Sequence, residues 1–432
     1  MSLCRGPRAG CSAGRRAARG ALVALIAFAS VAMAGAGEPG AGEPGAGEPD
    51  DRWVGLAALE PARQEIGVAA LAGKLYVIGG ILANRSTTGR GARYDPASGG
   101  WEEIDPLPGG AQLHHVGAAA LDGRVWAVGG LDASFRGVAT LFAFDPSTGA
   151  WQRHADLLRA RGAMGVAALS GRIYAAGGQT GGTSFRDLEA YDPIDDRWEP
   201  LPAMPTARNH LAAAALDGRF WAISGRAAGL RAELESYDPA RGEWSSHAAI
   251  PTARGGLAAA VAAGKIFAFG GEGNSARADG IFPQVEAFDP STGRWEPRPE
   301  MAIPRHGIGA AAIDGRIHIP GGAPIEGFAT TSAHDAFVPR ELARTGFLRG
   351  DANDDRIVDV SDAVLILYAL FLAELVLPCA DAADTDDDAR IAINDAIFVL
   401  DYLFRGGVAP PPPGPTIAGP DPSDDDLDCA RG

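Results

Sequence analysis

Two acidic stretches near the C-terminus carry oxygen-bearing side chains at the spacing of a calcium-binding loop. Ca2+ is a hard cation that takes about six to eight oxygen ligands, supplied by carboxylates at alternate positions, a backbone carbonyl and a final carboxylate. The first stretch offers Asp351, Asn353, Asp355, the carbonyl of Ile357, Asp359 and Asp362. The second offers Asp384, Asp386, Asp388, the carbonyl of Arg390, and Asp395. The sequence therefore predicts two bound calcium ions, against the alternative of a solvated acidic tail.

An apolar helix is expected after each acidic loop. The segments AVLILYALF and AIFVLDYLF begin at Ala363 and Ala396, 33 residues apart, and their apolar residues recur at intervals of three and four. The sixth loop position, usually glycine, is Arg356 in the first copy and Ala389 in the second. A side chain there costs about 1 kcal/mol if φ is positive, so we expect modest calcium affinity.

This duplicated arrangement of loop and helix resembles a dockerin, a calcium-dependent module that binds cohesin domains of extracellular assemblies, over roughly residues 350–405. The resemblance implies a small all-α domain with two calcium ions and a cohesin-like protein partner. In dockerins the residues at loop positions ten and eleven contact that partner. These positions hold Val360 and Ser361 in the first copy, and Ile393 and Asn394 in the second.

A second group of candidate residues recurs before residue 340, at intervals of roughly fifty residues. Five arginines occupy one position of the repeat, and Leu113 occupies it in the second unit. The two positions that follow hold variable polar residues, including four of the eight histidines. The candidates for ligand binding are Arg63, Glu65, His114, His115, Arg161, Arg208, His210, Arg254, Arg305 and His306.

The arginines have a structural alternative, which we favour, because a residue common to the units more often serves the repeat itself. They could pair with the acidic residues Glu189, Glu235, Glu286 and Asp335 of later strands. The histidines differ between units and are better candidates for specific binding, including a metal site made of neutral imidazoles. Apart from Glu65, no carboxylate stands out for acid–base chemistry, and no catalytic residue is assigned.

Short strands of a repeat must position these residues. Glycine pairs close an apolar strand in five units, and Ser224-Gly225 does so in another. An Ala- and Gly-rich strand precedes each of them, while an aromatic residue with Asp, and then a Trp, follow in the first five units. Four strands per unit and six units predict an all-β fold, a six-bladed β-propeller, in which radial repetition protects the sheet edges.

The order of double glycine, aromatic residue and Trp resembles the kelch repeat, over residues 51–340. In kelch-like propellers the Arg and His positions described above border the mouth of the central channel, where ligands often bind. Copper oxidases with kelch-like propellers use a Cys cross-linked to Tyr. No Cys lies in this segment, so that chemistry is disfavoured.

The last unit indicates how the ring closes. No Trp follows Phe337, whereas Trp53 stands alone ahead of the first unit. We predict that an N-terminal strand around Trp53 completes the last blade and removes an exposed sheet edge.

The N-terminus predicts export. Five arginines and no acidic residue occupy the first twenty positions, and an apolar run then ends in Ala32-Met33-Ala34, as in a secretory signal peptide. We therefore expect a secreted or cell-surface protein with no transmembrane segment in the mature chain. Three GAGEP copies read as a flexible spacer. We expect Cys379 and Cys429 to form a disulfide in an oxidising compartment.

These observations divide the chain and restrict its function. The predicted parts are a signal peptide (1–34), a linker (35–50), a propeller (51–340), a dockerin-like domain (349–407) and a Pro-rich acidic tail (408–432). A net charge of −16 without a basic footprint argues against nucleic-acid binding. The favoured function is a non-enzymatic recognition or scaffold propeller for protein or glycan, held through its calcium-binding module. The alternative is a secreted carbohydrate-active enzyme, such as a sugar isomerase or epimerase, that uses Arg and His at the mouth.

Overall fold

The structure, a computed structural model, describes residues 51–344, 347–353, 357–372, 377, 379–416 and 427. The predicted signal peptide and the linker lie outside these residues, as do Asp355, Arg356 and Cys429. Within the described ranges, no helix is long and apolar enough to cross a membrane.

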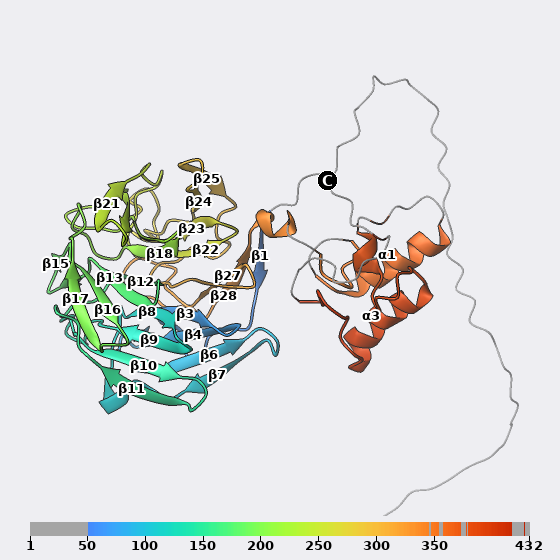
Figure 1. The fold of residues 1–432 in the computed structure, drawn as a ribbon, viewed down its shortest axis with the longest axis horizontal. Coiled ribbons are helices and arrows are strands. Elements are labelled where there is room, and N and C mark those ends of the chain that lie inside the picture. The colour runs from blue at the N-terminus through green and yellow to red at the C-terminus, as the bar shows by residue number, and fades with distance from the viewer. Residues whose placement is uncertain are drawn as a thin grey trace, which may run out of the picture. The chain divides into compact units, whose positions relative to one another are not determined.

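Six four-stranded antiparallel sheets surround a central axis and form a six-bladed β-propeller (Figure 1). Blade 1 contains β3 (Gly67–Leu71), β4 (Lys74–Ile78), β6 (Gly91–Asp95) and β7 (Gly100–Ile104); blade 2 contains β8 (Gly117–Leu121), β9 (Arg124–Val128), β10 (Leu141–Asp145) and β11 (Ala150–His154). Blade 3 contains β12 (Gly165–Leu169), β13 (Arg172–Ala176), β16 (Leu188–Asp192) and β17 (Arg197–Leu201); blade 4 contains β18 (Ala212–Leu216), β19 (Arg219–Ile223), β20 (Leu234–Asp238) and β21 (Glu243–Ser246). Blade 5 contains β22 (Ala258–Ala262), β23 (Lys265–Phe269), β24 (Val285–Asp289) and β25 (Arg294–Arg298); blade 6 contains β26 (Ala311–Ile313), β27 (Arg316–Pro320), β28 (His334–Val338) and β1 (Arg52–Gly55).

Smaller elements lie between the blade strands. Two-residue strands pair as β2 (Arg63–Gln64) with β5 (Ile81–Leu82) and as β14 (Gln179–Thr180) with β15 (Thr183–Ser184). Short 3-10 helices, η1 (Pro108–Gly110) and η2 (Arg340–Arg344), follow blades 1 and 6.

Small residues dominate the innermost strands, because six of these strands meet around the axis. The sequences of β3, β8 and β18 are GVAAL, GAAAL and AAAAL. A Cβ added to Gly117 of β8 would lie 2.3 Å from a methyl of Val166 in β12. Interiors are packed too closely to absorb such an overlap, so the small residues determine how near the blades approach one another.

The Trp of each outer strand joins its blade to the preceding one. The indole N–H of Trp151 in β11 donates a hydrogen bond of 2.7 Å to the carbonyl of Asp105, which follows blade 1. Trp198 in β17 bonds to Ala155 in the same way, at 2.9 Å. The same contact recurs for Trp101, Trp244 and Trp295.

The N-terminal strand closes the ring, as the sequence predicted. Strand β1 pairs antiparallel with β28, which places Trp53 opposite Phe337. The Trp53 indole N–H donates to the carbonyl of Pro299, 3.4 Å away, and so repeats the contact that the other outer strands make. An ion pair between Asp51 and Arg298, with 3.1 Å from Oδ2 to Nη1, ties the start of this strand to blade 5.

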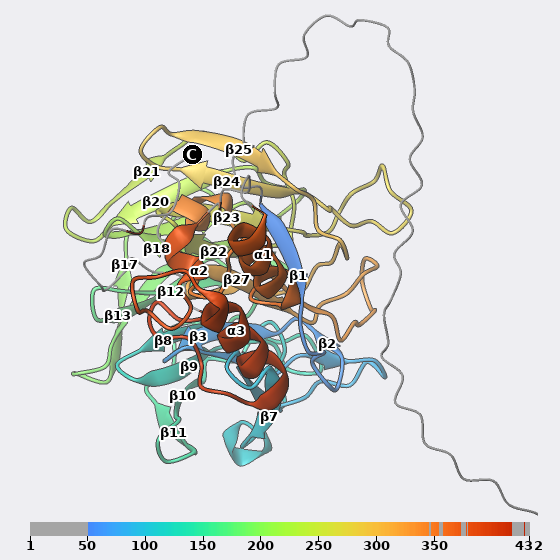
Figure 2. The same ribbon diagram turned by 90° about the vertical axis from the view of Figure 1, so that its right-hand side faces the viewer.

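A small helical region follows the propeller in sequence. It contains α1 (Val360–Phe371), α2 (Ala380–Ala383) and α3 (Ile393–Arg405), and α1 and α3 lie side by side (Figure 2). Their shared core includes Ala363 and Ile366 of α1, with Ala396 and Val399 of α3 at the equivalent positions 33 residues later. Burial of matching residues makes the two loop-helix copies a single packed unit.

Candidate functional sites

A ring of six backbone hydrogen bonds surrounds the propeller axis. Each blade contributes the residue two positions after the aligned Arg, or after Leu113 in blade 2, and its N–H donates to the carbonyl of the equivalent residue in the neighbouring blade at 2.7 to 3.0 Å. All six residues have a positive φ, between 50° and 65°. This left-handed backbone is uncommon for residues other than glycine, so it is a constraint imposed by the ring. The six residues are Glu65, His115, Ala163, His210, Gly256 and Gly307.

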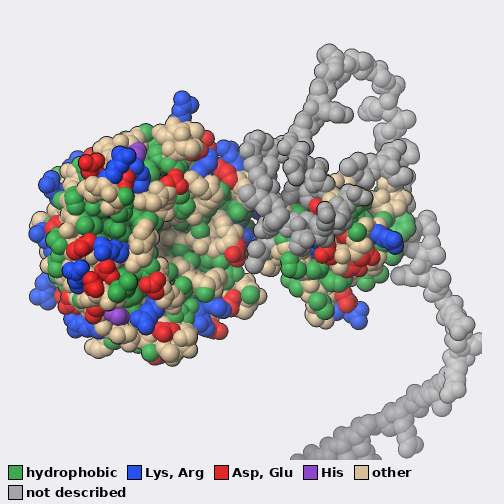
Figure 3. All heavy atoms as spheres, viewed as in Figure 1, with side chains coloured by type: hydrophobic (Ala, Val, Ile, Leu, Met, Phe, Trp, Pro, Cys, Tyr) green, Lys and Arg blue, Asp and Glu red, His purple; other side chains and the backbone are tan. Residues whose placement is uncertain are grey.

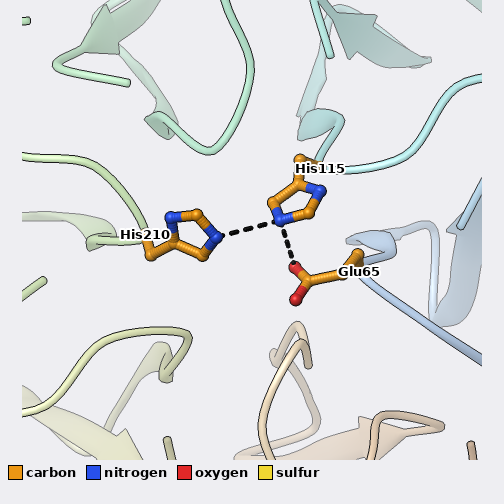
Figure 4. Close-up of side chains that lie close together, drawn as sticks. All are labelled: Glu65, His115 and His210. Atoms are coloured by element: carbon orange, nitrogen blue, oxygen red, sulfur yellow. Dashed lines mark hydrogen bonds and ion pairs between the residues drawn. The ribbon is translucent and has the colours of Figure 1, made fainter. Parts of the chain in front are cut away.

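Three of these ring residues bring side chains together on the axis (Figure 4). The distance from His115 Nε2 to His210 Nε2 is 2.9 Å, and that from His115 Nε2 to Glu65 Oε2 is 3.0 Å. The other three blades carry Ala or Gly at this position, which leaves room for the cluster. All three residues are ligand-binding candidates by their position in the repeat, and the structure brings their side chains into one axial site.

Burial controls the charge of this axial site. It is the main cause that holds the pKa of both His115 and His210 well below the usual range, so both imidazoles are neutral at neutral pH. Burial, with a smaller contribution from the charge of Glu272, raises the pKa of Glu65 to about 8.

The tautomer of His115 follows from its neighbour His114. Burial lowers the pKa of His114 to about 4, so this ring is neutral as well. Its Nε2 lies 3.0 Å from the carbonyl oxygen of Asp132 and must donate to it, which leaves its Nδ1 as an acceptor. His114 Nδ1 contacts His115 Nδ1, and we assign the proton to His115. The Nε2 lone pair of His115 therefore faces Glu65 and His210.

His210 presents a lone pair to the same point. Arg226 Nη2 lies 2.9 Å from His210 Nε2, and because a guanidinium can only donate, that nitrogen accepts. The opposite nitrogen, Nδ1, then carries the proton and donates it to Asn209 Oδ1, while Asn209 Nδ2 donates to Ser184 Oγ at 2.6 Å. These contacts fix both the tautomer and the orientation of the ring.

Glu272 and His306 complete the wall of the site. Glu272 accepts a hydrogen bond from Arg226 Nη1 at 2.6 Å, and its other oxygen lies 3.3 Å from His306 Nδ1. His306 is fully buried, and its Nε2 donates to the carbonyl of Ile325 at 3.2 Å. Its Nδ1 is buried and, within the described part of the chain, has no hydrogen-bond partner.

The arginines form the ion pairs that the sequence suggested as their structural alternative. Arg161 pairs with Glu189 and Arg254 with Glu286, and each of these arginines is 0% exposed. The distance from Arg208 Nη2 to Glu235 is 3.0 Å, and that from Arg305 Nη1 to Asp335 is 2.8 Å. These guanidinium groups are buried. In this conformation they stabilise the blades and are not accessible to a ligand at the mouth.

Arg63 of blade 1 differs from the other aligned arginines. The third strand of its blade carries Ala92 where the blades of the other four arginines carry Glu or Asp, and Arg63 Nη1 donates to the Pro61 carbonyl at 3.3 Å. Burial, together with the charge of Arg90, lowers its pKa to about 10.

Two charged residues of the axial site, Arg226 and Glu272, were not foreseen from the sequence. They directly follow Ser224-Gly225 and Gly270-Gly271, the pairs that close the second strand of blades 4 and 5. The residue after each pair bridges back to the segment beside the ring, as Arg226 does to Asn209 and Glu272 does to Gly255. The position just after the glycine pair was therefore the signal that could have identified them.

Exposed apolar side chains lie near the axial site. Phe135 is 40% exposed, and its ring centroid lies 4.7 Å from that of His114 and 6.2 Å from that of Phe328. Phe328 is half exposed, and the Arg85 guanidinium lies 5.3 Å from the centre of its ring. These loops of blades 1, 2 and 6 form an apolar rim beside a polar, buried floor. Over the propeller face drawn in Figure 3, basic and acidic side chains are interspersed.

The second acidic loop gathers its carboxylates. Oxygens of Asp384, Asp386 and Asp388 lie within 4.8 Å of one another. Asp384 and Asp395 are 0% exposed, and burial is the main cause that raises the pKa of both. The carbonyl position, Arg390, is exposed at its side chain. Ala389, at the sixth loop position, has φ of 66°, so the positive φ that makes a side chain costly at this position is present.

The first acidic loop is described except at residues 354–356, which include Asp355. Asp351 and Asp362 are buried, and Asp362 accepts hydrogen bonds from the backbone N–H of Asn353 and Asp359 at 3.2 and 2.8 Å. Ile357, whose side chain is half exposed, was expected to contribute its carbonyl.

Loop positions ten and eleven, which were expected to contact a partner, have similar hydrogen bonds and similar exposure in the two copies. Asn353 Nδ2 donates to Ser361 Oγ at 2.9 Å, and Asn394 Nδ2 donates to Asp386 Oδ2 at 2.6 Å, so the eleventh loop position turns toward the third in both. Val360 and Ile393, at the tenth position, are about half exposed. Buried Cys379 is disulfide-bonded, and its predicted partner Cys429 lies outside the described residues.

Comparison with known proteins supports the repeat. The Kelch motif matches residues 112–157, 160–205 and 253–302. The Kelch-like protein terF of Aspergillus terreus (strain NIH 2624 / FGSC A1156) is 33% identical over 67 residues, which are 16% of this chain and only 15% of that protein. The solved structure of YjhT matches with a TM-score of 0.55 at 15% identity, over 65% of this chain and 95% of that one, a likeness of fold alone.

Proposed function

We propose that this chain, a six-bladed propeller with Kelch repeats, is an exported recognition scaffold that binds a protein or glycan at the mouth of its ring. In this proposal the helical region binds two calcium ions and, in the manner of a dockerin, attaches the propeller to a cohesin-like protein partner. Kelch propellers generally bind proteins, which agrees with the first part.

The observation that carries the proposal is the duplication of the acidic loop. Four carboxylates, Asp351 and Asp362 in one copy and Asp384 and Asp395 in the other, are buried at the ends of the two loops. Burying carboxylates is unfavourable unless a cation or hydrogen bonds compensate them. Backbone N–H groups offset part of this cost at Asp362 and Asp395. Bound calcium at both loops would offset more of it and join each loop to the helix after it.

The exposed face of the helical region supports a protein partner. Val364 and Phe371 of α1 are 41% and 70% exposed, and their equivalents in α3, Ile397 and Phe404, are 55% and 71% exposed. Exposed apolar residues at equivalent places on two helices form the kind of surface that protein interfaces cover.

Capture experiments with and without calcium test the two attachments separately. The secreted proteins of the source organism would be passed over immobilised protein, and a partner of the helical region should elute with chelator. A partner of the mouth should be lost in the Phe135→Ser, Phe328→Ser double variant and kept in Ile194→Ser, which changes a 92% exposed residue on a blade-exterior turn. Partners that survive both the chelator and the double variant would contradict the proposal.

We expect Ala389→Gly to tighten the second calcium site about fivefold. Glycine removes the cost of a side chain at φ 66°, about 1 kcal/mol, which corresponds to this factor. Calorimetric titration of calcium into wild type and variant measures the change, and Ala409→Gly, in an exposed stretch without positive φ, is the matched control. Unchanged or weaker affinity in Ala389→Gly would show that this loop does not bind the ion in the conformation described.

A carbohydrate-active enzyme is the second candidate, and one observation favours it. Glu65, with its pKa raised to about 8, is suited to hold or release a proton near neutral pH beside the neutral imidazole of His115. Polarimetry of sugar anomerisation with wild type and Glu65→Gln would test this activity, which requires the carboxyl group.

A further inference from the structure

The spacing of three ligand atoms on the axis matches the coordination shell of a small divalent metal ion. Nitrogen and oxygen ligands bind such ions at about 2.1 Å, so two ligands at a right angle are about 3.0 Å apart and two at the tetrahedral angle about 3.4 Å apart. The two measured distances from His115 Nε2, 2.9 Å to His210 Nε2 and 3.0 Å to Glu65 Oε2, correspond to the first value. All three ligand atoms lie within 4.8 Å of one another.

The axial site also has more hydrogen-bond acceptors than donors. Lone pairs of His115 Nε2 and His210 Nε2 face each other, and His306 Nδ1 directs a third toward Glu272 and Glu65, 3.3 and 3.8 Å away. Among the described residues, the guanidinium of Arg226 is the cationic donor in contact with this group, and it bonds to Glu272 and His210. The Glu65 carboxyl, when protonated, donates one further hydrogen bond to His115 Nε2, and a metal ion would replace that proton. Acceptors that point at one another without protons repel, and a cation between them removes the repulsion.

We propose that Glu65, His115 and His210 bind one divalent transition-metal ion on the propeller axis, through the Glu65 carboxylate and the two Nε2 atoms. Two imidazoles and one carboxylate suit zinc, iron or cobalt and do not suit calcium, which takes oxygen ligands. The site is thus separate in chemistry from the acidic loops, and it does not depend on the recognition function proposed above.

Hydrogen bonds at the Nδ1 atoms hold both imidazoles in the tautomer that leaves Nε2 free of a proton, as such a site needs. Metal-bound histidines almost always donate their other N–H to a fixed acceptor, which orients the ring. His210 donates to Asn209, and His115 donates to His114, which is itself held by the carbonyl of Asp132. Asn209 and His114 are therefore positioning residues of the metal site.

Arg226 competes with the metal for His210. Its Nη2 bonds to the His210 Nε2 lone pair, and its positive charge opposes a second cation nearby. The Arg226 side chain is partly exposed, so its Nη2 can turn away from His210 while its Nη1 stays bonded to Glu272. Metal affinity should rise when this side chain is removed, whereas it should fall when a ligand is removed.

Cobalt titration of the untagged full-length chain tests the site. The protein would be freed of metals with chelator and then held in excess Ca2+, so that Co2+ cannot bind in the acidic loops. We expect one Co2+ per chain with visible d–d absorption. His210→Ala and Glu65→Gln should each weaken binding by at least about tenfold to a hundredfold, and Asn209→Ala by about tenfold. The matched control His247→Ala removes an imidazole next to Trp221, on the outer part of blade 4, and should change nothing.

The Arg226→Met variant tests the metal site even if a variant of a metal ligand fails to fold. We expect it to bind Co2+ about tenfold more tightly, a gain that a purely structural arginine would not give. The proposal is overturned if calcium-saturated wild type binds less than half an equivalent of Co2+, if His210→Ala and Glu65→Gln fold and bind as wild type does, or if Arg226→Met binds more weakly.

Discussion

Deleting residues 51–55 should lower the midpoint of thermal unfolding of the propeller by at least about 6 °C and make the protein prone to association. Loss of the Trp53 side chain alone should cost about 3 kcal/mol, and each kcal/mol corresponds to roughly 2 °C in a domain as large as residues 51–340. The deletion also exposes the backbone edge of β28, which pairs with β1 over four residues in the intact ring.

Differential scanning calorimetry and light scattering would measure these effects. Trp53→Ala separates the side chain, which packs edge-on against Phe337 with centroids 5.1 Å apart, from the strand pairing. Deleting residues 35–50, the predicted linker, is the control for shortening the N-terminus. A truncated chain as stable and as monodisperse as this control would show that blade 6 does not need its fourth strand.

Removing calcium should unfold the helical region and leave the propeller folded. The buried carboxylates of Asp362 and Asp395 each close one loop onto its helix, and without a cation the acidic groups of the loops repel one another. Binding free energy is then folding free energy for this region. Chelator should therefore remove much of the α-helical circular dichroism, and limited proteolysis should cleave first between residues 347 and 416.

Variants identify the groups responsible for this dependence. Asp362→Ala with Asp395→Ala should behave in calcium as wild type does in chelator. Asp401→Ala, which removes a partly exposed carboxylate of α3 outside the loops, should keep the wild-type response. Full helical signal and protease resistance of the wild-type chain in excess chelator would show that the acidic loops do not depend on calcium.

Much of the propeller could be predicted because each unit of the repeat contains a recognisable pair of residues at the end of its second strand. The six unit ends, at five glycine pairs and Ser224-Gly225, gave the number of blades, and the unpaired Trp53 gave the closure that β1 makes. The ion pairs of Arg161 and Arg254 could be suggested because each arginine and its acid recur in phase.

The axial site could be predicted only in part. Glu65, His115 and His210 stood out because they vary at a fixed position, but their spacing along the chain does not indicate that blades 1, 2 and 4 direct them to one point. Arg226 and Glu272 meet these residues through tertiary contacts between blades 4 and 5. No local pattern records such a contact, because it depends on closing the ring.

The ring of hydrogen bonds around the axis separates what holds the blades together from what the axis can do. Each member contributes only its backbone N–H and carbonyl, so Glu, His, Ala and Gly all serve in it. The residue at each of the six ring positions can therefore be substituted independently of the others. The new residue must tolerate a left-handed backbone, as Asn, Asp, His and Gly do. Substitutions at these six positions would change the side chains on the axis without changing the hydrogen bonds that hold the blades together. The ring is therefore a suitable place to vary binding specificity or to introduce a new site.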